Sequence, residues 1–312
     1  MYSVIMSTYN ECACELSAAI DSVLNQSFTD YEFIIVCDNP NNNELHGILN
    51  AYEEKDNRVN IIYNKENMGL ALSLNVAIQA SKGEYLIRMD ADDICKPNRF
   101  QKQVDVMQTG KYDLIWSAYD YIDENGCLLD KKPEYIPDSL IQKLLPIENI
   151  IHHPTVVMKR QVFMDAGMYR NFPCAQDYDL WLRMLDNGCR MHMMDESLLL
   201  YRVRTSSITN KKKYQQLCTL AYIRYITSVR KKTGKDKYSF DGYLAYMKKL
   251  GVNEKKIEQK FHNAQKYVAE GKQLIRDHKL ISGCICILKG FFQSKFYRKQ
   301  SLLIVKRKMV KK

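Results

Sequence analysis

Short runs of β-branched and other apolar residues alternate with segments of helical periodicity over the first 90 residues. Four of these runs have the length of strands, at Val4–Thr8, Glu32–Val36, Val59–Tyr63 and Tyr85–Met89. The segments between them repeat apolar residues every three or four positions, which is typical of helices with one buried face. This alternation predicts right-handed β-α-β units and a parallel sheet covered by helices.

The pattern changes after residue 112, where an apolar run is followed by turn residues instead of a long helical segment. Such a change indicates antiparallel or mixed strands added to the parallel sheet. The elements expected there are a strand at 114–122, a turn at 124–126, a returning strand at 127–129, a strand at 155–158, helices at 161–166 and from 177, and an extended segment at 190–204.

Charge divides the chain more sharply than its total suggests. The net charge is +10 over 312 residues, but residues 211–312 hold 27 Lys and Arg against 6 Asp and Glu, a net of +21. Residues 1–210 hold 19 against 30, a net of −11. We therefore expect an acidic α/β domain at 1–210 and a basic, helical region at 211–312, with different partners.

Several protein classes are disfavoured by composition. No window approaches the roughly 18 consecutive apolar residues of a membrane-spanning helix, and the first residues lack the basic segment of a signal peptide. Residence in the cytoplasm is therefore expected, with the 10 cysteines reduced. Their close pairs, Cys12/Cys14 and Cys284/Cys286, have a C-x-C spacing that fits neither zinc sites nor thioredoxin-like redox motifs.

Polar residues follow three of the predicted strands at their carboxyl ends, where open α/β sheets bind ligands. They are Ser7–Glu11, Asp38 and the run Asp90–Asp93. No G-x-G-x-x-G follows the first strand, which disfavours a dinucleotide-binding domain. Carboxylates this close repel one another unless a cation lies among them, and a divalent ion shared with substrate phosphates would meet that need. The alternative is a solvated acidic loop ahead of a helix.

Five motifs in a fixed order extend these observations. They are SVIMSTYNE from Ser3, Asp38, Asn67-Met68-Gly69-Leu70-Ala71, Arg88-Met89-Asp90-Ala91-Asp92-Asp93, and Gln176-Asp177-Tyr178-Asp179-Leu180-Trp181. Residues 1–210 resemble family 2 glycosyltransferases, in particular bacterial enzymes that build capsular polysaccharide, exopolysaccharide or O-antigen. The resemblance implies a GT-A fold, a mixed but mainly parallel sheet flanked by helices. Its nucleotide-binding half would be 1–110 and its acceptor-binding half 111–210.

The resemblance also implies roles at the donor site. Thr8, Tyr9 and Asp38 would hold the nucleoside, with Tyr9 stacking on the base and Asp38 accepting a hydrogen bond from it, and Asn67 is assigned to the same site. Tyr9 could instead be a packed loop aromatic, and Asp38 could be a turn residue before Pro40.

Asp90 and Asp92 would take the D-x-D role, holding Mg²⁺ or Mn²⁺ against the diphosphate. Arg88 would add positive charge nearby, or would be a strand residue paired with a neighbouring acid. Arg204 stands where relatives commonly carry a His that completes the metal site or contacts the diphosphate. Arg cannot ligate a cation but can pair with phosphate, so Arg204 either stands in place of a metal ligand, which would weaken metal affinity, or contacts the diphosphate.

Asp177 is the candidate general base. Inverting transfer needs a carboxylate near the acceptor hydroxyl, on the sugar face opposite the departing nucleotide. Asp177 could alternatively be only a helix N-cap. Asp179 is the second candidate for the base, and Trp181 is either a sugar-stacking platform or part of the core.

The expected activity is metal-dependent, inverting transfer of a sugar from a nucleoside diphosphate, expected to be UDP, to a hydroxyl of a lipid-linked glycan in surface polysaccharide biosynthesis. A nucleotidyltransferase that makes sugar nucleotides is one alternative, but the chain lacks the Gly-rich phosphate loop expected after the first strand. A non-catalytic binding protein that uses its basic region is the other; nucleic-acid binding would make its affinity strongly salt-dependent.

The basic region offers a membrane interpretation. Leu280–Phe292 is apolar apart from Lys289, basic residues follow it, and no acid occurs after Asp277. Basic residues interleaved with Phe, Leu and Ile are typical of helices that lie in the interface of an anionic bilayer. Residues 280–312 are therefore predicted to attach the protein peripherally to the cytosolic face of the plasma membrane. No nucleic-acid partner is expected, and solvated helix faces are the default alternative.

Overall fold

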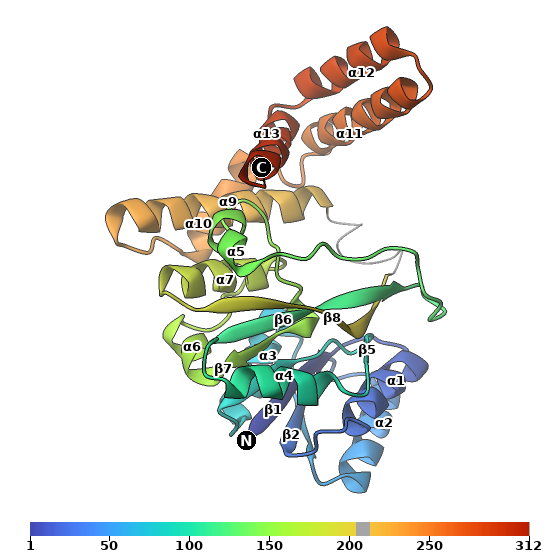
Figure 1. Ribbon diagram of the computed structural model, residues 1–312, viewed down its shortest axis with the longest axis vertical. Coiled ribbons are helices and arrows are strands. Elements are labelled where there is room, and N and C mark those ends of the chain that lie inside the picture. The colour runs from blue at the N-terminus through green and yellow to red at the C-terminus, as the bar shows by residue number, and fades with distance from the viewer. Residues whose placement is uncertain (204–212, 312) are drawn as a thin grey trace. The chain divides into compact units, whose positions relative to one another are not determined.

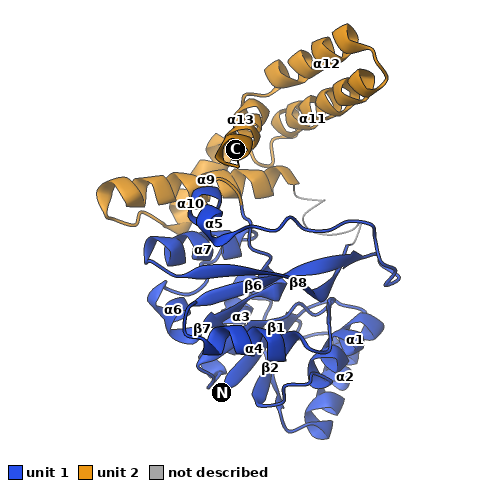
Figure 2. Cartoon of the chain, viewed as in Figure 1, with its two compact units in different colours: residues 1–145, 149–207 blue, residues 146–148, 208–312 orange. Residues whose placement is uncertain are grey.

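The computed structural model describes residues 1–203 and 213–311. The chain divides into two compact units (Figure 2). Unit 1 comprises residues 1–145 and 149–207, and unit 2 comprises residues 146–148 and 208–312.

Unit 1 is built on one mixed sheet, with eight strands among the described residues in the order β3-β2-β1-β4-β7-β6-β8-β5 (Figure 1). Strands β3, β2, β1 and β4 are parallel. Strand β7 is antiparallel to β4 and β6, β8 is parallel to β6, and β5 is antiparallel to β8. The strands are β1 Tyr2–Thr8, β2 Tyr31–Cys37, β3 Val59–Tyr63, β4 Tyr85–Arg88, β5 Ile94–Cys95, β6 Leu114–Ile122, β7 Val157–Lys159 and β8 Met191–Arg202.

The parallel half follows the predicted β-α-β pattern. Its helices are α1 Ala13–Leu24, α2 Asn43–Lys55, α3 Leu70–Ala80 and α4 Arg99–Gln108. The middle of β1 and most of β2 are apolar and buried on both faces of the sheet: Val4 and Ile5 are 0% and 2% exposed, and Ile34 and Ile35 are 3% and 0% exposed. This packing places the carboxyl ends of β1, β2 and β4 at one edge of the sheet.

The remaining elements of unit 1 are α5 Asp138–Leu144, a 3-10 helix at His153–Thr155, α6 Arg160–Asp165 and α7 Gln176–Asp186. The predicted returning strand at 127–129 is reduced to one antiparallel bridge between Leu128 and Ile122, with the N–H of Leu129 donating to the carbonyl oxygen of Tyr121 at 2.8 Å. Leu128 is 69% exposed, and a polar run with Pro133 follows it. The turn is also held by its first residue, since Oδ1 of Asp123 accepts the backbone N–H groups of Asn125 and Cys127.

Unit 2 is helical, as the sequence predicted. Its helices are α9 Lys213–Thr233, α10 Phe240–Lys249, α11 Lys255–Arg276, α12 Leu280–Gln293 and α13 Lys295–Val310. Helix α9 continues to Thr233 and is followed by Gly234, whose φ of 68° is typical of a glycine that ends a helix. No helix in the described part of the chain combines the length and apolar character needed to cross a bilayer.

Candidate active site

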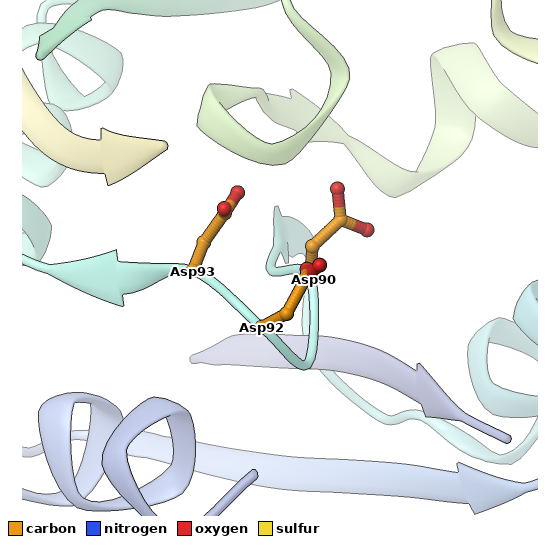
Figure 3. A group of neighbouring side chains, drawn as sticks. All are labelled: Asp90, Asp92 and Asp93. Carbon is orange, nitrogen blue, oxygen red and sulfur yellow. The ribbon is translucent and has the colours of Figure 1, made fainter. Parts of the chain in front are cut away.

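The acidic run lies on the short loop between β4 and β5. Carboxylate oxygens of Asp90, Asp92 and Asp93 lie within 4.8 Å of one another, and the three side chains project to the same side of the loop (Figure 3). Strand β4 ends at Arg88, and residues 89–93 lead the chain into the two-residue strand β5, which begins at Ile94. Three carboxylates at this spacing offer the oxygen ligands that Mg²⁺ and Mn²⁺ prefer.

Asp93 gives the clearest sign that a cation fits this cluster. Its side chain is fully buried, and Oδ1 accepts the backbone N–H of Arg202 at 2.9 Å, whereas Oδ2 has no hydrogen-bond partner among the described residues. Burial raises the pKa of Asp93 well above its usual value, and the charges of Asp90 and Asp92 raise it further. A buried, unpartnered carboxylate oxygen beside two other carboxylates is a costly arrangement that a divalent ion would relieve.

The sequence assigned the metal to Asp90 and Asp92 and left Asp93 without a role. The only available signal was its place in the same acidic run. Arg202 was also missed, although it fixes the loop from β8: Nε donates to the carbonyl oxygen of Asp92 at 2.9 Å. Nη1 of Arg202 donates to the carbonyl oxygens of Asp123 and Glu124, at 3.2 and 3.0 Å.

Arg88 is the positive charge closest along the chain to the acidic loop. Its side chain is only 3% exposed, and Nη2 pairs with Oδ1 of Asp90. Within the described residues, Nε and Nη1 of Arg88 have no hydrogen-bond partner. The structure therefore places Arg88 as the ion-pair partner of a neighbouring acid, which was the alternative drawn from the sequence. Arg204 lies outside the described residues.

The loop after β1 presents Tyr9 at the surface. The side chain of Tyr9 is 41% exposed, whereas Thr8 is buried and donates from Oγ1 to Oε2 of Glu11 at 2.6 Å. The backbone N–H of Tyr9 donates to the same oxygen at 2.8 Å, and Nδ2 of Asn39 donates to the carbonyl oxygen of Tyr9 at 3.0 Å. Glu11 and Asn39 thus hold this loop from both sides and leave the Tyr9 ring open for stacking.

Asp38 directly follows strand β2, and its carboxylate binds the loop that precedes α3. Its Oδ1 accepts from Nδ2 of Asn64 at 2.7 Å and from the backbone N–H of Met68 at 2.8 Å, while Oδ2 accepts the N–H of Gly69 at 2.8 Å. Asn67, which is exposed, also accepts the N–H of Gly69 at 3.1 Å. Gly69 has φ 81°, which favours glycine at this entry to α3. Asp38 therefore holds the loop that begins α3, and its contact with a nucleoside stays a prediction.

Asp177 lies on α7, far along the chain from the acidic loop, and is close enough to that loop for the charge of Asp90 to affect its pKa. It is partly buried, and Oδ2 accepts from Nδ2 of Asn149 at 2.8 Å. Burial raises the pKa of Asp177, and the charge of Asp90 raises it further. Hydrogen bonds from Asn149 and from the backbone at the start of α7 lower this pKa and partly offset the rise. The N-cap of α7 is Ala175, so Asp177 lies inside the first turn and does not act as the cap.

The two alternatives near Asp177 are structural. Asp179 has no exposed surface and accepts from Nε of Arg183 at 2.9 Å and from Nη1 of Arg170 at 3.3 Å. It is enclosed in an ion-pair cluster and offers no surface to a substrate. Trp181 is also completely buried and belongs to the core.

Residues 3–167 match the family described as Glycosyl transferase family 2. The chain belongs to this family. An uncharacterized glycosyltransferase of Methanocaldococcus jannaschii is 37% identical over 205 residues, which cover 65% of this chain and 71% of the relative. The O-antigen biosynthesis glycosyltransferase WbnJ of Escherichia coli is 36% identical over 210 residues, which cover 66% of this chain and 81% of the relative. Both alignments cover about two thirds of this family 2 glycosyltransferase.

Solved structures confirm the predicted GT-A fold of this glycosyltransferase. The S. aureus TarS fragment 1–349 in complex with UDP-GlcNAc has a TM-score of 0.57 at 16% identity, covering 80% of this chain and 79% of the other. The mannosyltransferase PcManGT of Pyrobaculum calidifontis, in complex with GDP-Man and Mn²⁺, has a TM-score of 0.59 at 16% identity, covering 98% and 85%.

Aromatic side chains of the glycosyltransferase form a cluster beside the acidic loop. The rings of Tyr119 and His152 are stacked with centroids 3.8 Å apart, and Tyr201 meets His152 edge-on at 4.4 Å. Burial lowers the pKa of His152 to about 3, so it is neutral at physiological pH. Burial raises the pKa of Tyr201, and the charges of Asp93 and Asp90 add to that rise, which places this cluster near the carboxylates.

Proposed function

We propose that this protein transfers a sugar, with inversion, from a nucleoside diphosphate to a hydroxyl group of a glycan, and that a divalent cation assists the transfer. The observation that carries the proposal is the position of the Asp93 carboxylate, buried with one unpartnered oxygen beside Asp90 and Asp92. A cation bound by these carboxylates would stabilise the negative charge of a nucleotide diphosphate more than that of any other part of the substrate.

The three carboxylates would hold Mn²⁺ or Mg²⁺, which when bound neutralises the charge that develops on the departing diphosphate. Arg202 keeps the loop in position, because its side chain donates to the backbone carbonyl oxygen of Asp92 and its backbone N–H donates to the carboxylate of Asp93. Because these groups are fixed before substrate arrives, little reorganisation is needed during transfer.

Asp177 would act as the general base. It shares the site with Asp90 yet comes from α7, so the acceptor hydroxyl can be deprotonated away from the leaving diphosphate. Burial raises the pKa of Asp177, and this makes its ionised form a stronger base at neutral pH. The hydrogen bond from Asn149 fixes the orientation of the carboxylate.

Donor binding would use the loops after β1 and β2. The exposed ring of Tyr9 is placed to stack on the base, and we assign Thr8, Asp38 and Asn67 to the support of the nucleoside site. UDP is the proposed nucleotide. Its support is indirect, since solved structures of similar fold hold UDP-GlcNAc in TarS and GDP-Man in PcManGT.

The acceptor is proposed to be a growing glycan on a lipid carrier, in surface polysaccharide biosynthesis. Relatives named for O-antigen, teichuronic acid and amylovoran biosynthesis support a polysaccharide acceptor. The rings of Tyr119, Tyr121 and Tyr201 next to the acidic loop provide apolar faces against which a sugar ring could pack.

Matched carboxylate variants test these assignments. Thermal unfolding is measured with a panel of nucleotide sugars, with and without Mn²⁺, for the wild type, Asp92→Asn and Asp177→Asn. A donor at about 100 times its Kd stabilises the protein by about 2.7 kcal/mol, which is readily measured. We expect Asp92→Asn to lose the Mn²⁺-dependent part of this stabilisation, and Asp177→Asn to keep it.

Transfer is then followed by nucleotide diphosphate release with a glycan acceptor. Asp177→Asn is expected to lose transfer, whereas Asp30→Asn, the same substitution at an exposed position, retains it. Full turnover in Asp177→Asn, or unchanged Mn²⁺-dependent stabilisation in Asp92→Asn, would refute the corresponding role.

A further inference from the structure

Helices α11 and α12 of unit 2 pack through glycines. A Cβ added at Gly283 would lie 2.7 Å from the carbonyl oxygen of Gly271, and one at Gly290 would lie 2.7 Å from that of Ala264. A Cβ at Gly271 would meet the carbonyl oxygen of Gly283 at 2.7 Å. Contacts this short leave no room for side chains, so the glycines determine which face of α12 lies against α11.

The opposite face of α12 is apolar and open to solvent. Ile281, Ile285, Leu288 and Phe292 follow one another at spacings of four, three and four, which places them on one stripe of the helix. They are 80%, 48%, 54% and 70% exposed. We call these four residues the α12 stripe. Large apolar side chains this exposed along one helix face are characteristic of an interaction surface.

Positive charge surrounds the α12 stripe. Lys289 lies within the helix, and Lys279 and Lys295 flank its two ends. The guanidinium of Arg298 lies 5.9 Å from the ring centroid of Phe292, at the end of the stripe. The sequence contains no acidic residue after Asp277. A partner for this surface must therefore offer both an apolar region and negative charge.

An anionic phospholipid surface meets both requirements. Helix α12 has 14 residues and is about 21 Å long, shorter than the roughly 30 Å hydrocarbon core of a bilayer. Such a helix suits the interface, where its apolar face enters the acyl region and its basic residues stay among the headgroups.

We propose that the α12 stripe inserts into the interface of an anionic membrane and holds the protein there. The glycine contacts with α11 keep the α12 stripe pointing outward before the protein meets a membrane. Binding therefore requires little further loss of conformational entropy. Surrounding Lys and Arg supply the attraction to anionic headgroups. This inference does not depend on the sugar-transfer proposal, because it rests only on residues of unit 2.

The test is co-sedimentation of the full chain with vesicles of phosphatidylglycerol and phosphatidylcholine in equal parts, compared with phosphatidylcholine alone. Phe292→Ser is expected to lower the partition coefficient by about tenfold, because one large apolar side chain no longer leaves water. Lys289→Gln is expected to lower it by about fivefold on the anionic vesicles only. Leu128→Ser in unit 1, an equally exposed apolar residue at 69%, is the matched control and should bind as the wild type does.

Circular dichroism of each variant shows whether it folds, and hydrogen exchange of residues 280–293 reports insertion directly. Protection of that segment on anionic vesicles supports the proposal. Equal binding by Phe292→Ser and the wild type would overturn it, as would vesicle binding without protection of α12. Sedimentation velocity without lipid completes the test: a dimer that Phe292→Ser abolishes, with no vesicle binding, would assign the stripe to a second copy of the chain instead. Donor-induced thermal stabilisation, measured on the same samples, reports the sugar-transfer site separately.

Discussion

The hydrogen bonds of Asp38 allow a quantitative prediction for Asp38→Asn. The carboxylate is 3% exposed and accepts three N–H groups, from Asn64, Met68 and Gly69, at 2.7–2.8 Å. An amide keeps the shape, but one of its two polar atoms becomes a donor. If the amide oxygen takes the Oδ1 position, the new NH₂ group faces the N–H of Gly69.

The expected cost is the sum of two changes. Two charge-assisted hydrogen bonds become neutral ones, at about 1 kcal/mol each, and the third is lost at about 1–2 kcal/mol, because Asn67 still accepts from Gly69. The total is about 3–4 kcal/mol. For a unit of about 200 residues this corresponds to a fall in Tm of roughly 6–16 °C.

Circular dichroism melting of the full chain measures this change, and hydrogen exchange of residues 64–70 locates it. Asp30→Asn, the same substitution at an exposed position, is the control and should change Tm by less than about 2 °C. A Tm for Asp38→Asn equal to that of the control, with unchanged exchange at Gly69, would show that Asp38 does not hold the loop before α3.

Three further changes follow from the same structure. Burial raises the pKa of Asp177 above 3.8, so its charged form opposes folding at neutral pH. Asp177→Asn should therefore raise Tm at pH 7, and this gain should shrink as the pH is lowered toward 3.8. A lower Tm for Asp177→Asn at pH 7 would contradict this reasoning. The transfer rate of the wild type should fall as the pH is lowered through that raised pKa. Asp179→Asn should lower the free energy of unfolding by about 3–5 kcal/mol, since it removes the buried carboxylate charge that pairs with Arg170 and Arg183. A value under about 1 kcal/mol in urea melts would argue against the ion-pair cluster. Gly283→Ala should lower the free energy of unfolding by about 1–3 kcal/mol, because the added Cβ clashes with Gly271. Gly47→Ala, where the added Cβ meets nothing within 4 Å, is the control and should be neutral or stabilising. Equal effects of the two substitutions in thermal melts would refute the close helix packing.

The parallel half of the sheet was predictable because its central strands are largely apolar and buried and because helices with a regular apolar period separate its strands. Strands β1 to β4 lie where the apolar runs indicated. Strand β5 was not predicted, because its two residues, Ile94 and Cys95, carry no period and pair with β8 from far along the chain. The returning strand at 127–129 is reduced to one antiparallel bridge, because turn residues identify a reversal of the chain but do not show how far the ladder continues beyond it.

The candidate site was predicted in its residue types and less well in their contacts. Asp90, Asp92 and Asp177 were proposed from motif order, and in the folded chain the charge of Asp90 affects the pKa of Asp177. The burial of Asp93 and the bonds of Arg202 to this loop depend on β8, which approaches only in the folded chain. Sequence alone therefore could not show which acid of the run is deprived of solvent.

The most direct test of the central claim measures the affinity for UDP by calorimetry with and without Mn²⁺, in the wild type and in Asp93→Asn. This substitution retains an oxygen for the N–H of Arg202 and removes the carboxylate charge that lies beside Asp90 and Asp92. The account predicts that Mn²⁺ raises the affinity of the wild type at least about tenfold, by about 1.4 kcal/mol, and that Asp93→Asn loses most of this gain. An affinity for UDP that is the same with and without Mn²⁺ in the wild type, or a gain that Asp93→Asn retains in full, would contradict it.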